Sequence, residues 1–215
     1  MTRSRSARAA AIAAMTLAIG LLGPAWAPSL ASARIQDGLT SSTGAHFAVA
    51  KPEVRGIANF AEIEPGLARG ASPSDEGIEY LRAHGYKTVV AFWSRQDERE
   101  RLARAGIELV ELPIRSSIFG ADTPTPEQID AFLRLAADPA RRPLFLHCRK
   151  GKDRTGAMTA IYRMERQGWR SSDAVEEMNA FGFHRHYRKL YRFVETYPIA
   201  SSRAARSAGE PPKSR

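Results

Sequence analysis

Apolar runs along the chain predict the strands of a buried sheet. Residues 88–93 and 144–146 are almost continuously apolar, and residues 107–112 return to strand character after a charged segment. Short runs of this kind are typical of strands covered on both faces, as in parallel sheets. Residues 57–60 and 66–70 are expected to form two further short strands around a Pro-Gly turn.

Helical periodicity separates these strands. Helices are expected at residues 72–85, 96–105, 125–138, from the loop after residue 148 to about 168, and at 171–181 and 184–197. Ser72 before a proline is typical of a helix start, and Thr125 with Gln128 matches a capping box. The charges of the second helix, Glu98 among them, are interpreted as a solvated face. This order predicts an α/β fold with a mainly parallel central sheet flanked by helices.

The amino end differs in composition from the folded middle. Arg3, Arg5 and Arg8 precede an apolar stretch at residues 9–22, and residues 31–33, Ala-Ser-Ala, form a small-residue cleavage pattern. This arrangement is typical of a Sec-type signal peptide. A membrane anchor is the alternative, but the apolar stretch is short and is interrupted by glycine and proline.

Four regions are therefore expected. They are a signal peptide at 1–33, a flexible leader at 34–53, one folded domain at 54–199, and a disordered basic tail at 200–215. The protein is expected to be exported to the periplasm or the medium, with no stable membrane insertion after the signal is cleaved.

Charge and cysteine content narrow the classes of function. The formal net charge is +9, and about +6 once the three arginines of the predicted signal are removed. Nucleic-acid binding is not needed to explain this excess, although anionic substrates would be attracted. The single cysteine, Cys148, excludes an internal disulfide, and an exported free thiol implies a purpose such as nucleophilic catalysis. No metal or cofactor is expected, because His184 and His186, the nearest approach to a ligand pair, are interpreted as a surface pair.

The most informative segment is residues 147–156, His-Cys-Arg-Lys-Gly-Lys-Asp-Arg-Thr-Gly, between a predicted strand and a predicted helix. Loop amides and a helix N-terminus concentrate positive potential at such a junction and bind anions. The same field favours the thiolate of Cys148, which is its nucleophilic form. Six positions later, the planar guanidinium of Arg154 can hold two phosphate oxygens. A nucleotide P-loop is excluded, because the position that requires glycine holds Leu146.

The residues around the nucleophile receive separate roles. Candidate phosphate-binding residues are Arg149, Lys150, Gly151, Lys152, Asp153 and Arg154, and candidate supporting residues are His147 and Thr155. His147 is expected to hydrogen-bond the loop backbone or to tune the thiolate, unless it is a core histidine. Thr155 is expected to assist release of the thiolate. Asp153 is expected to steer a water or to contact the substrate.

The order Cys, five residues, Arg and then Thr-Gly resembles the signature of the cysteine-dependent tyrosine and dual-specificity phosphatases. Residues 69–73, 162–164 and 168–169 are similar to exported bacterial dual-specificity phosphatases and to atypical fungal and plant enzymes that act on inositol pyrophosphates. The likeness covers roughly residues 54–197. Rhodanese-like proteins and some arsenate reductases also use a cysteine-started anion loop, but the Arg-Thr-Gly exit fits phosphatases better. The resemblance implies a dual-specificity-phosphatase-like fold.

A phosphatase of this kind benefits from a general acid, and Asp122 is the candidate. Asp122 lies in an irregular segment between a strand and a helix upstream of Cys148. Because a parallel sheet gathers its strand-to-helix loops at one edge, this segment is expected to reach the anion loop. The alternative is that Asp122 belongs to an Asx-turn or caps a helix.

The expected reaction is hydrolysis of phosphate monoesters through a cysteinyl-phosphate on Cys148. The expected substrates are proteins that carry phosphotyrosine, phosphoserine or phosphothreonine. The extra Arg and Lys residues of the loop leave an inositol phosphate or phosphoinositide as an alternative substrate. A non-catalytic phosphate-binding module is the second alternative.

Overall fold

The computed structural model describes residues 46–117 and 120–199. The predicted signal peptide, most of the predicted leader and the predicted tail lie outside the described residues. Within the described part of the chain, no helix is both long enough and apolar enough to cross a membrane.

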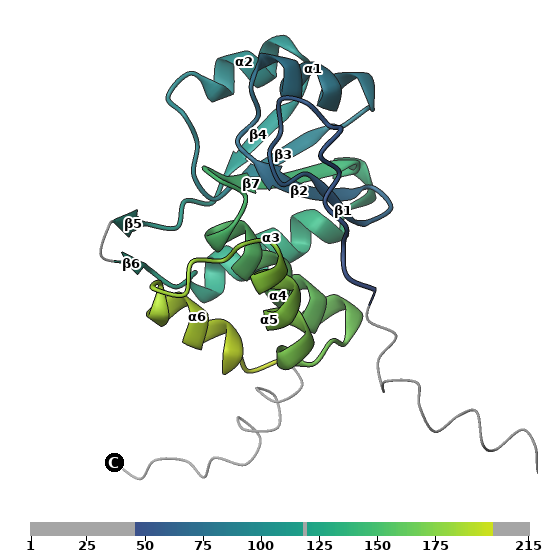
Figure 1. The fold of residues 1–215 in the computed structure, drawn as a ribbon. Coiled ribbons are helices and arrows are strands. Elements are labelled where there is room, and N and C mark those ends of the chain that lie inside the picture. The colour runs from purple at the N-terminus through teal and green to yellow at the C-terminus, as the bar shows by residue number, and fades with distance from the viewer. Residues whose placement is uncertain (1–45, 118–119, 200–215) are drawn as a thin grey trace, which may run out of the picture. The chain divides into compact units, whose positions relative to one another are not determined.

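A five-stranded sheet in the order β1-β2-β7-β3-β4 carries the fold (Figure 1). Its strands are β1 (Ala61–Glu64), β2 (Leu67–Ala71), β3 (Thr88–Ala91), β4 (Glu108–Glu111) and β7 (Leu144–Cys148). Only β1 runs antiparallel to its neighbour, and the other pairs are parallel. A separate ladder joins β5 (Ser116–Ser117) to β6 (Gly120–Ala121). The predicted α/β class with a mainly parallel sheet is confirmed.

Helices cover both faces of this sheet. They are α1 (Asp75–Ala83), α2 (Glu98–Arg104), α3 (Pro126–Ala137), α4 (Asp153–Gln167), α5 (Ser171–Ala180) and α6 (Arg188–Glu195), with a short 3₁₀ turn η1 (Pro139–Arg141). Figure 1 shows α1 and α2 on one face and α3 to α6 on the other.

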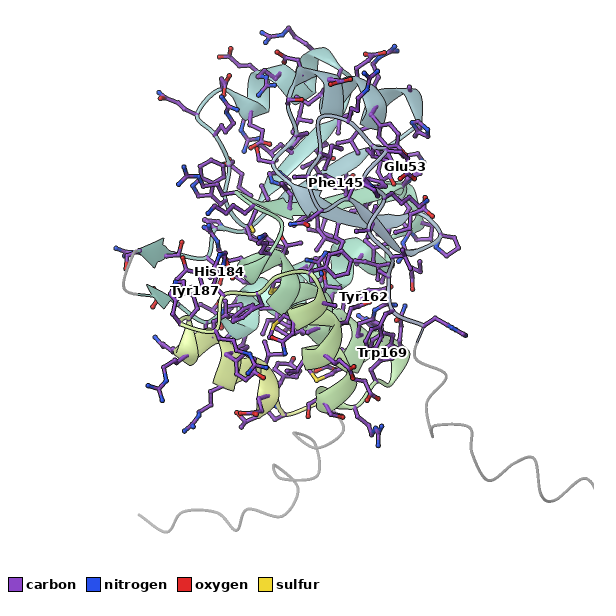
Figure 2. All side chains as sticks on the ribbon, viewed as in Figure 1. Glu53, Phe145, Tyr162, Trp169, His184 and Tyr187 are labelled. Atoms are coloured by element: carbon purple, nitrogen blue, oxygen red, sulfur yellow. The ribbon has the colours of Figure 1, made fainter. Side chains whose placement is uncertain are left out.

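The apolar runs are continuous because each strand is buried on both sides. Val89 and Phe145 belong to the core beneath α1 and α2, whereas Val90 and Leu146 belong to the core beneath α3 and α4. Alternate residues of one strand point to opposite faces of the sheet, so both faces require apolar side chains. Figure 2 shows Phe145 within the sheet layer. Because β7 lies between β2 and β3, its carboxyl end opens at the middle of the sheet edge.

The two predicted helix starts had different outcomes. The capping box of α3 is present, because Thr125 Oγ1 accepts from the Gln128 amide at 3.3 Å and the Gln128 side chain accepts from the Thr125 amide at 2.9 Å. The cap predicted at Ser72 is wrong, since Ser74 accepts from the Gly77 amide and α1 begins at residue 75.

The packed chain also begins earlier than the expected boundary at residue 54. The ring of Phe47 stacks on Trp169 with centroids 5.6 Å apart. The amide of Ala48 donates to Oε1 of Glu177 at 2.8 Å. The last residues of the predicted leader are therefore held by the side chains of Trp169 and Glu177, which follow the Cys148 loop in the chain.

Candidate active site

Cys148 is the last residue of β7, and α4 begins at Asp153. The residues between them form the predicted loop between strand and helix. The Cys148 side chain is buried, with 2% of its surface exposed. Because β7 is the central strand, the loop projects from the middle of the sheet edge, where the adjacent strand β2 can support it.

Two backbone carbonyls of the loop are held from outside. The amide of Ser72 donates to the carbonyl of Cys148 at 2.8 Å. The side-chain amide of Asn59 donates to the carbonyl of Lys150 at 3.0 Å. A trans peptide presents its N–H opposite to its C=O, so these contacts turn the following amides toward the interior of the loop. Such inward amides form an anion-binding nest.

A third carbonyl is held by a buried cation. Nη2 of Arg69 donates to the carbonyl of Gly151 at 2.6 Å, and the guanidinium lies 3.9 Å from the centroid of the Phe181 ring. Arg69 is fully buried, and burial lowers its pKa to about 10. Its Nε and Nη1 have no hydrogen-bond partner among the described residues. Arg69 therefore places a positive charge directly behind the loop.

Gly151 is required where the loop touches β2. Its φ is +66°, in the left-handed region. A Cβ on this residue would lie 2.6 Å from both the nitrogen of Ala71 and the carbonyl oxygen of Gly70, which is closer than non-bonded atoms approach. Position 151 therefore needs glycine both for its left-handed backbone conformation and for the close backbone contact with β2.

The loop opens into a cavity of about 340 Å³ that brings most of the predicted site residues together. It is lined by Ser116, Ser117, Cys148, Arg149, Lys150, Asp153, Arg154, His184, His186 and Tyr187. Gly151 and Lys152 are not among the lining residues. The cavity is therefore strongly cationic around a buried thiol, as binding of a phosphate group requires.

Arg154 and Thr155 stand at the start of α4 with different surroundings. Nη1 of Arg154 donates to the carbonyl of Ile114 at 3.3 Å, which ties the guanidinium to the segment after β4. The Thr155 hydroxyl is fully buried and has no hydrogen-bond partner among the described residues. This hydroxyl therefore forms no hydrogen bond with the Cys148 sulfur in this structure, and a role for Thr155 in release of the thiolate stays a prediction.

Asp153 joins the loop to the segment after α5. Its Oδ1 accepts from the backbone amide of His184 at 2.7 Å, and Nδ1 of His184 donates to the same oxygen at 2.9 Å. His184 and Tyr187 lie beside one another in Figure 2, and both line the cavity with His186. The two histidines lie at the surface as interpreted, His184 half-buried and His186 exposed, and the structure adds that they belong to the rim of this cavity. A role for Asp153 in steering water stays a prediction.

His147, which precedes the nucleophile, is fully buried against Glu98. Its Nε2 lies 3.3 Å from Oε1 of Glu98, without the geometry of a hydrogen bond. Burial lowers the pKa of His147 to about 4, so the ring is neutral near pH 7. Burial also raises the pKa of Glu98, which accepts hydrogen bonds from Ser72 Oγ and the Arg95 amide. Glu98 is fully buried, so its interpretation as part of a solvated face is wrong.

Asp122 does not line the cavity that contains Cys148. Its side chain is 57% exposed, and Oδ1 accepts from Nζ of Lys189 at 3.3 Å. Asp122 lines a neighbouring cavity of about 410 Å³, which shares Ser116 and Ser117 with the first. The predicted acid is thus placed next to the catalytic cavity, and its role stays a prediction.

Three supporting residues were not identified from the sequence. Asn59 and Arg69 hold loop carbonyls, and Glu98 packs on the histidine before the nucleophile. For Arg69 a signal existed, because a charged residue within a short apolar strand needs a buried partner. Asn59 has a positive φ of 55°, which its sequence neighbours do not reveal.

Known proteins with similar sequences include phosphatases. Residues 45–193 match a family model described as a DSP-PTPase phosphatase fused to NAD+ kinase. The dual specificity protein phosphatase TpbA of one Pseudomonas aeruginosa strain is 32% identical over 71% of this chain and 68% of that protein. For TpbA of a second strain, the identity is 35%, over 58% of this chain and 55% of that protein, so the match spans little more than half of that relative.

Solved structures agree with the sequence matches. The crystal structure of P. aeruginosa TpbA aligns with a TM-score of 0.59 and 29% identity, over 75% of this chain and 96% of that one. A more distant relative is the inositol diphosphatase DSP3 of Arabidopsis thaliana, which is 26% identical over 67% of this chain and 72% of that protein. The chain belongs to the dual-specificity phosphatase family of cysteine-dependent phosphatases.

Proposed function

We propose that this protein hydrolyses phosphate monoesters of phosphoproteins through a cysteinyl-phosphate intermediate. The observation that carries the proposal is that Cys148 and Arg154 line one cationic cavity, while the carbonyls of the intervening loop are bonded outward. Further support comes from relatives named dual specificity protein phosphatase, and from a crystal structure of a TpbA variant in complex with pTyr.

The reaction proceeds in two steps. The Cys148 thiolate attacks phosphorus, so that a sulfur–phosphorus bond forms while the bond to the leaving oxygen breaks. Arg154 and the inward amides hold the equatorial oxygens, where negative charge is concentrated. Water then attacks the cysteinyl phosphate, which releases inorganic phosphate and restores the thiolate.

The nucleophile is tested with a substrate that needs little leaving-group assistance. With p-nitrophenyl phosphate, Cys148→Ser is expected to lose turnover, because a serine hydroxyl is a much weaker nucleophile than a thiolate. Binding of inorganic phosphate or vanadate by this variant is expected to persist, since the amides and Arg154 are unchanged. Turnover of Cys148→Ser at the wild-type rate would refute the mechanism.

Asp122 is our proposed general acid. Asp122→Asn is expected to lose most turnover on phosphoserine peptides, whose alkoxide leaving group needs a proton, and less on p-nitrophenyl phosphate. Asp153→Asn is the matched comparison, because Asp153 is the carboxylate that lines the Cys148 cavity. If Asp153→Asn shows the dependence on the leaving group and Asp122→Asn does not, the assignment is wrong.

Inositol phosphates are the second candidate substrates. Arg149, Lys150 and Arg154 all line the cavity, and several cations suit several phosphates on one small molecule. The likeness to plant inositol diphosphatases favours the same alternative. Turnover of phosphotyrosyl peptides, phosphoseryl peptides and inositol polyphosphates under one condition decides between the substrate classes.

We also propose that the protein is exported, on the basis of the basic and apolar segment at residues 1–33. Expression of the full chain in a Gram-negative host is expected to give a periplasmic or secreted product that begins at Arg34. N-terminal sequencing of the fractionated protein tests this. An uncleaved chain in the membrane fraction would indicate an anchor instead.

A further inference from the structure

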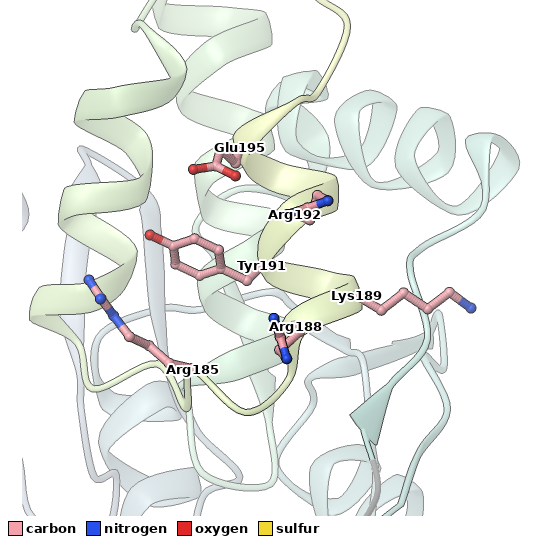
Figure 3. A pocket seen from close by; sticks show the side chains of 6 residues that line it. All are labelled: Arg185, Arg188, Lys189, Tyr191, Arg192 and Glu195. Carbon is pink, nitrogen blue, oxygen red and sulfur yellow. The ribbon is translucent and has the colours of Figure 1, made fainter.

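A basic surface lies on α6 and on Arg185, just before the helix. Arg185, Arg188 and Arg192, here called the α6 basic surface, line a cavity of about 540 Å³ (Figure 3). We propose that this surface binds acidic side chains of a phosphoprotein substrate at positions close to its phosphorylated residue. The inference rests on the proposed phosphatase function and names the feature of the substrate that the enzyme selects.

The three arginines are available for a ligand. All three are exposed, and within residues 46–117 and 120–199 no carboxylate lies at salt-bridge distance from any of them. The neighbouring Lys189 differs, because its Nζ is paired with Asp122. In Figure 3, Lys189 points away from Arg185 and Tyr191. The same cavity is lined by one carboxylate, that of Glu195, which forms no salt bridge with these arginines, so the surface carries an excess of positive charge.

This placement of charge works against the stability of α6. Cations in the first turn of a helix oppose its dipole, and α6 begins with Arg188 and has no acidic residue in that turn. Arg188 and Arg192 are four residues apart, where like charges repel. The opposite face of the helix is held by the buried Leu190 and Val194. A local arrangement that disfavours the helix without benefit to its packing is typical of a functional surface.

The α6 basic surface begins at the rim of the catalytic cavity. His184, His186 and Tyr187 line that cavity, and Tyr187 directly precedes the first residue of α6. Arg192 lies one helical turn beyond Arg188, about 6 Å along the axis. The rim residues His184, His186 and Tyr187 therefore connect the Cys148 cavity directly to the α6 basic surface.

The separation of the two cavities favours a polypeptide ligand. A phosphate bound at Cys148 cannot itself reach a surface that opens into a different cavity. An extended peptide advances about 3.4 Å per residue, so acidic side chains roughly two to four positions from the phosphorylated residue would span the rim. Carboxylates there would pair with guanidinium groups that form no salt bridge within the described residues, although Arg185 lies 5.8 Å from the centroid of the Tyr191 ring.

The experiment compares two phosphotyrosyl peptides of equal length. One carries glutamates two to four positions from the phosphotyrosine, on both sides, and the other carries glutamines there. The wild-type protein is expected to have a roughly threefold to tenfold higher kcat/KM for the acidic peptide, mainly through KM, as expected for two exposed ion pairs. The double variant Arg188→Gln with Arg192→Gln is expected to lose this preference and to keep wild-type turnover of p-nitrophenyl phosphate.

The matched control is Arg104→Gln with Arg134→Gln. These arginines are also exposed, lie on α2 and α3, and change the net charge by the same amount. The control is expected to keep the preference for the acidic peptide. Equal kcat/KM for both peptides in the wild type, or equal losses in both double variants, would overturn the inference. A loss confined to inositol polyphosphates would also overturn it, whereas inactivity of the wild type on p-nitrophenyl phosphate would refute the phosphatase function itself.

Discussion

The contact between Gly151 and β2 leads to the sharpest test of how the loop is built. Gly151 has φ of +66°, and Gly168, at the other end of α4, has φ of +68°. A Cβ on Gly151 would meet the backbone of Gly70 and Ala71, whereas a Cβ on Gly168 would meet nothing within 4 Å. The two Gly→Ala variants therefore share the backbone strain and differ in the steric contact.

The expected magnitudes follow from this comparison. Placing alanine in the left-handed region costs about 1–2 kcal/mol, so Gly168→Ala is expected to lower the free energy of unfolding by that amount. Gly151→Ala adds overpacking of about 1–3 kcal/mol. Since β2 is paired on both sides, by β1 and β7, the loop must move by about 1 Å to restore contact distance, and such a displacement costs on the order of 10²-fold in rate.

Urea unfolding and p-nitrophenyl phosphate turnover measure the two effects. Gly168→Ala is expected to keep the wild-type kcat, and Gly151→Ala is expected to lose activity even where it is fully folded. Circular dichroism below the unfolding transition establishes that state for each variant. If Gly151→Ala were as stable and as active as Gly168→Ala, the close contact between the loop and β2 would not be what positions the loop.

Three further variants test buried ionisable residues. Glu177→Ala is expected to lower the free energy of unfolding by about 3–5 kcal/mol in urea, because Arg163 donates two hydrogen bonds to this buried carboxylate and its buried charge would lose that counterion. For His147, burial holds the pKa at about 4, against 6.5 unfolded, so the unfolded state binds more protons between these values and stability falls on acidification. His147→Gln is expected to remove up to ~3 kcal/mol of this loss of stability at low pH, measured as the difference from wild type when unfolding is followed as a function of pH. Glu98 contributes in the opposite direction, because burial raises its pKa, and this contribution is present in both proteins. Arg69→Met is expected to lower kcat at least ~10-fold, because the Gly151 carbonyl loses its donor, yet to change unfolding by no more than ~2 kcal/mol, and a large loss of stability without a loss of kcat would contradict the assigned role.

Features that depend on near neighbours were predictable from the sequence. The capping box at Thr125 involves residues three positions apart, and the apolar run from residue 88 needs only burial on two faces. The anion loop likewise carries its nucleophile, its guanidinium and its helix start within one short segment. Each of these signals is local, so the chain itself displays it.

The supports of the loop depend on contacts between distant segments. Asn59 and Arg69 bond loop carbonyls that are 91 and 82 positions away. Glu98 lies in a charged helix whose pattern does not show which charge faces inward. It accepts a hydrogen bond from Ser72, whose hydroxyl does not cap α1. These contacts form only because the sheet order places β2 beside β7, and the sequence pattern does not reveal that order.

Buried polar atoms without a partner concentrate around the nucleophile. Of the seven such side-chain atoms in the described residues, five belong to Arg69, His147 and Thr155, which lie behind, before and after the Cys148 loop. Each unpartnered atom disfavours folding, so packing alone gives no reason for this distribution. Arg69 places positive charge behind a loop that binds anions, and the neutral His147 next to the nucleophile adds no charge of its own. The anion-binding site thus explains why these buried polar groups lie around Cys148. They lower the stability of the fold, and in return the loop amides already point inward before a phosphate binds.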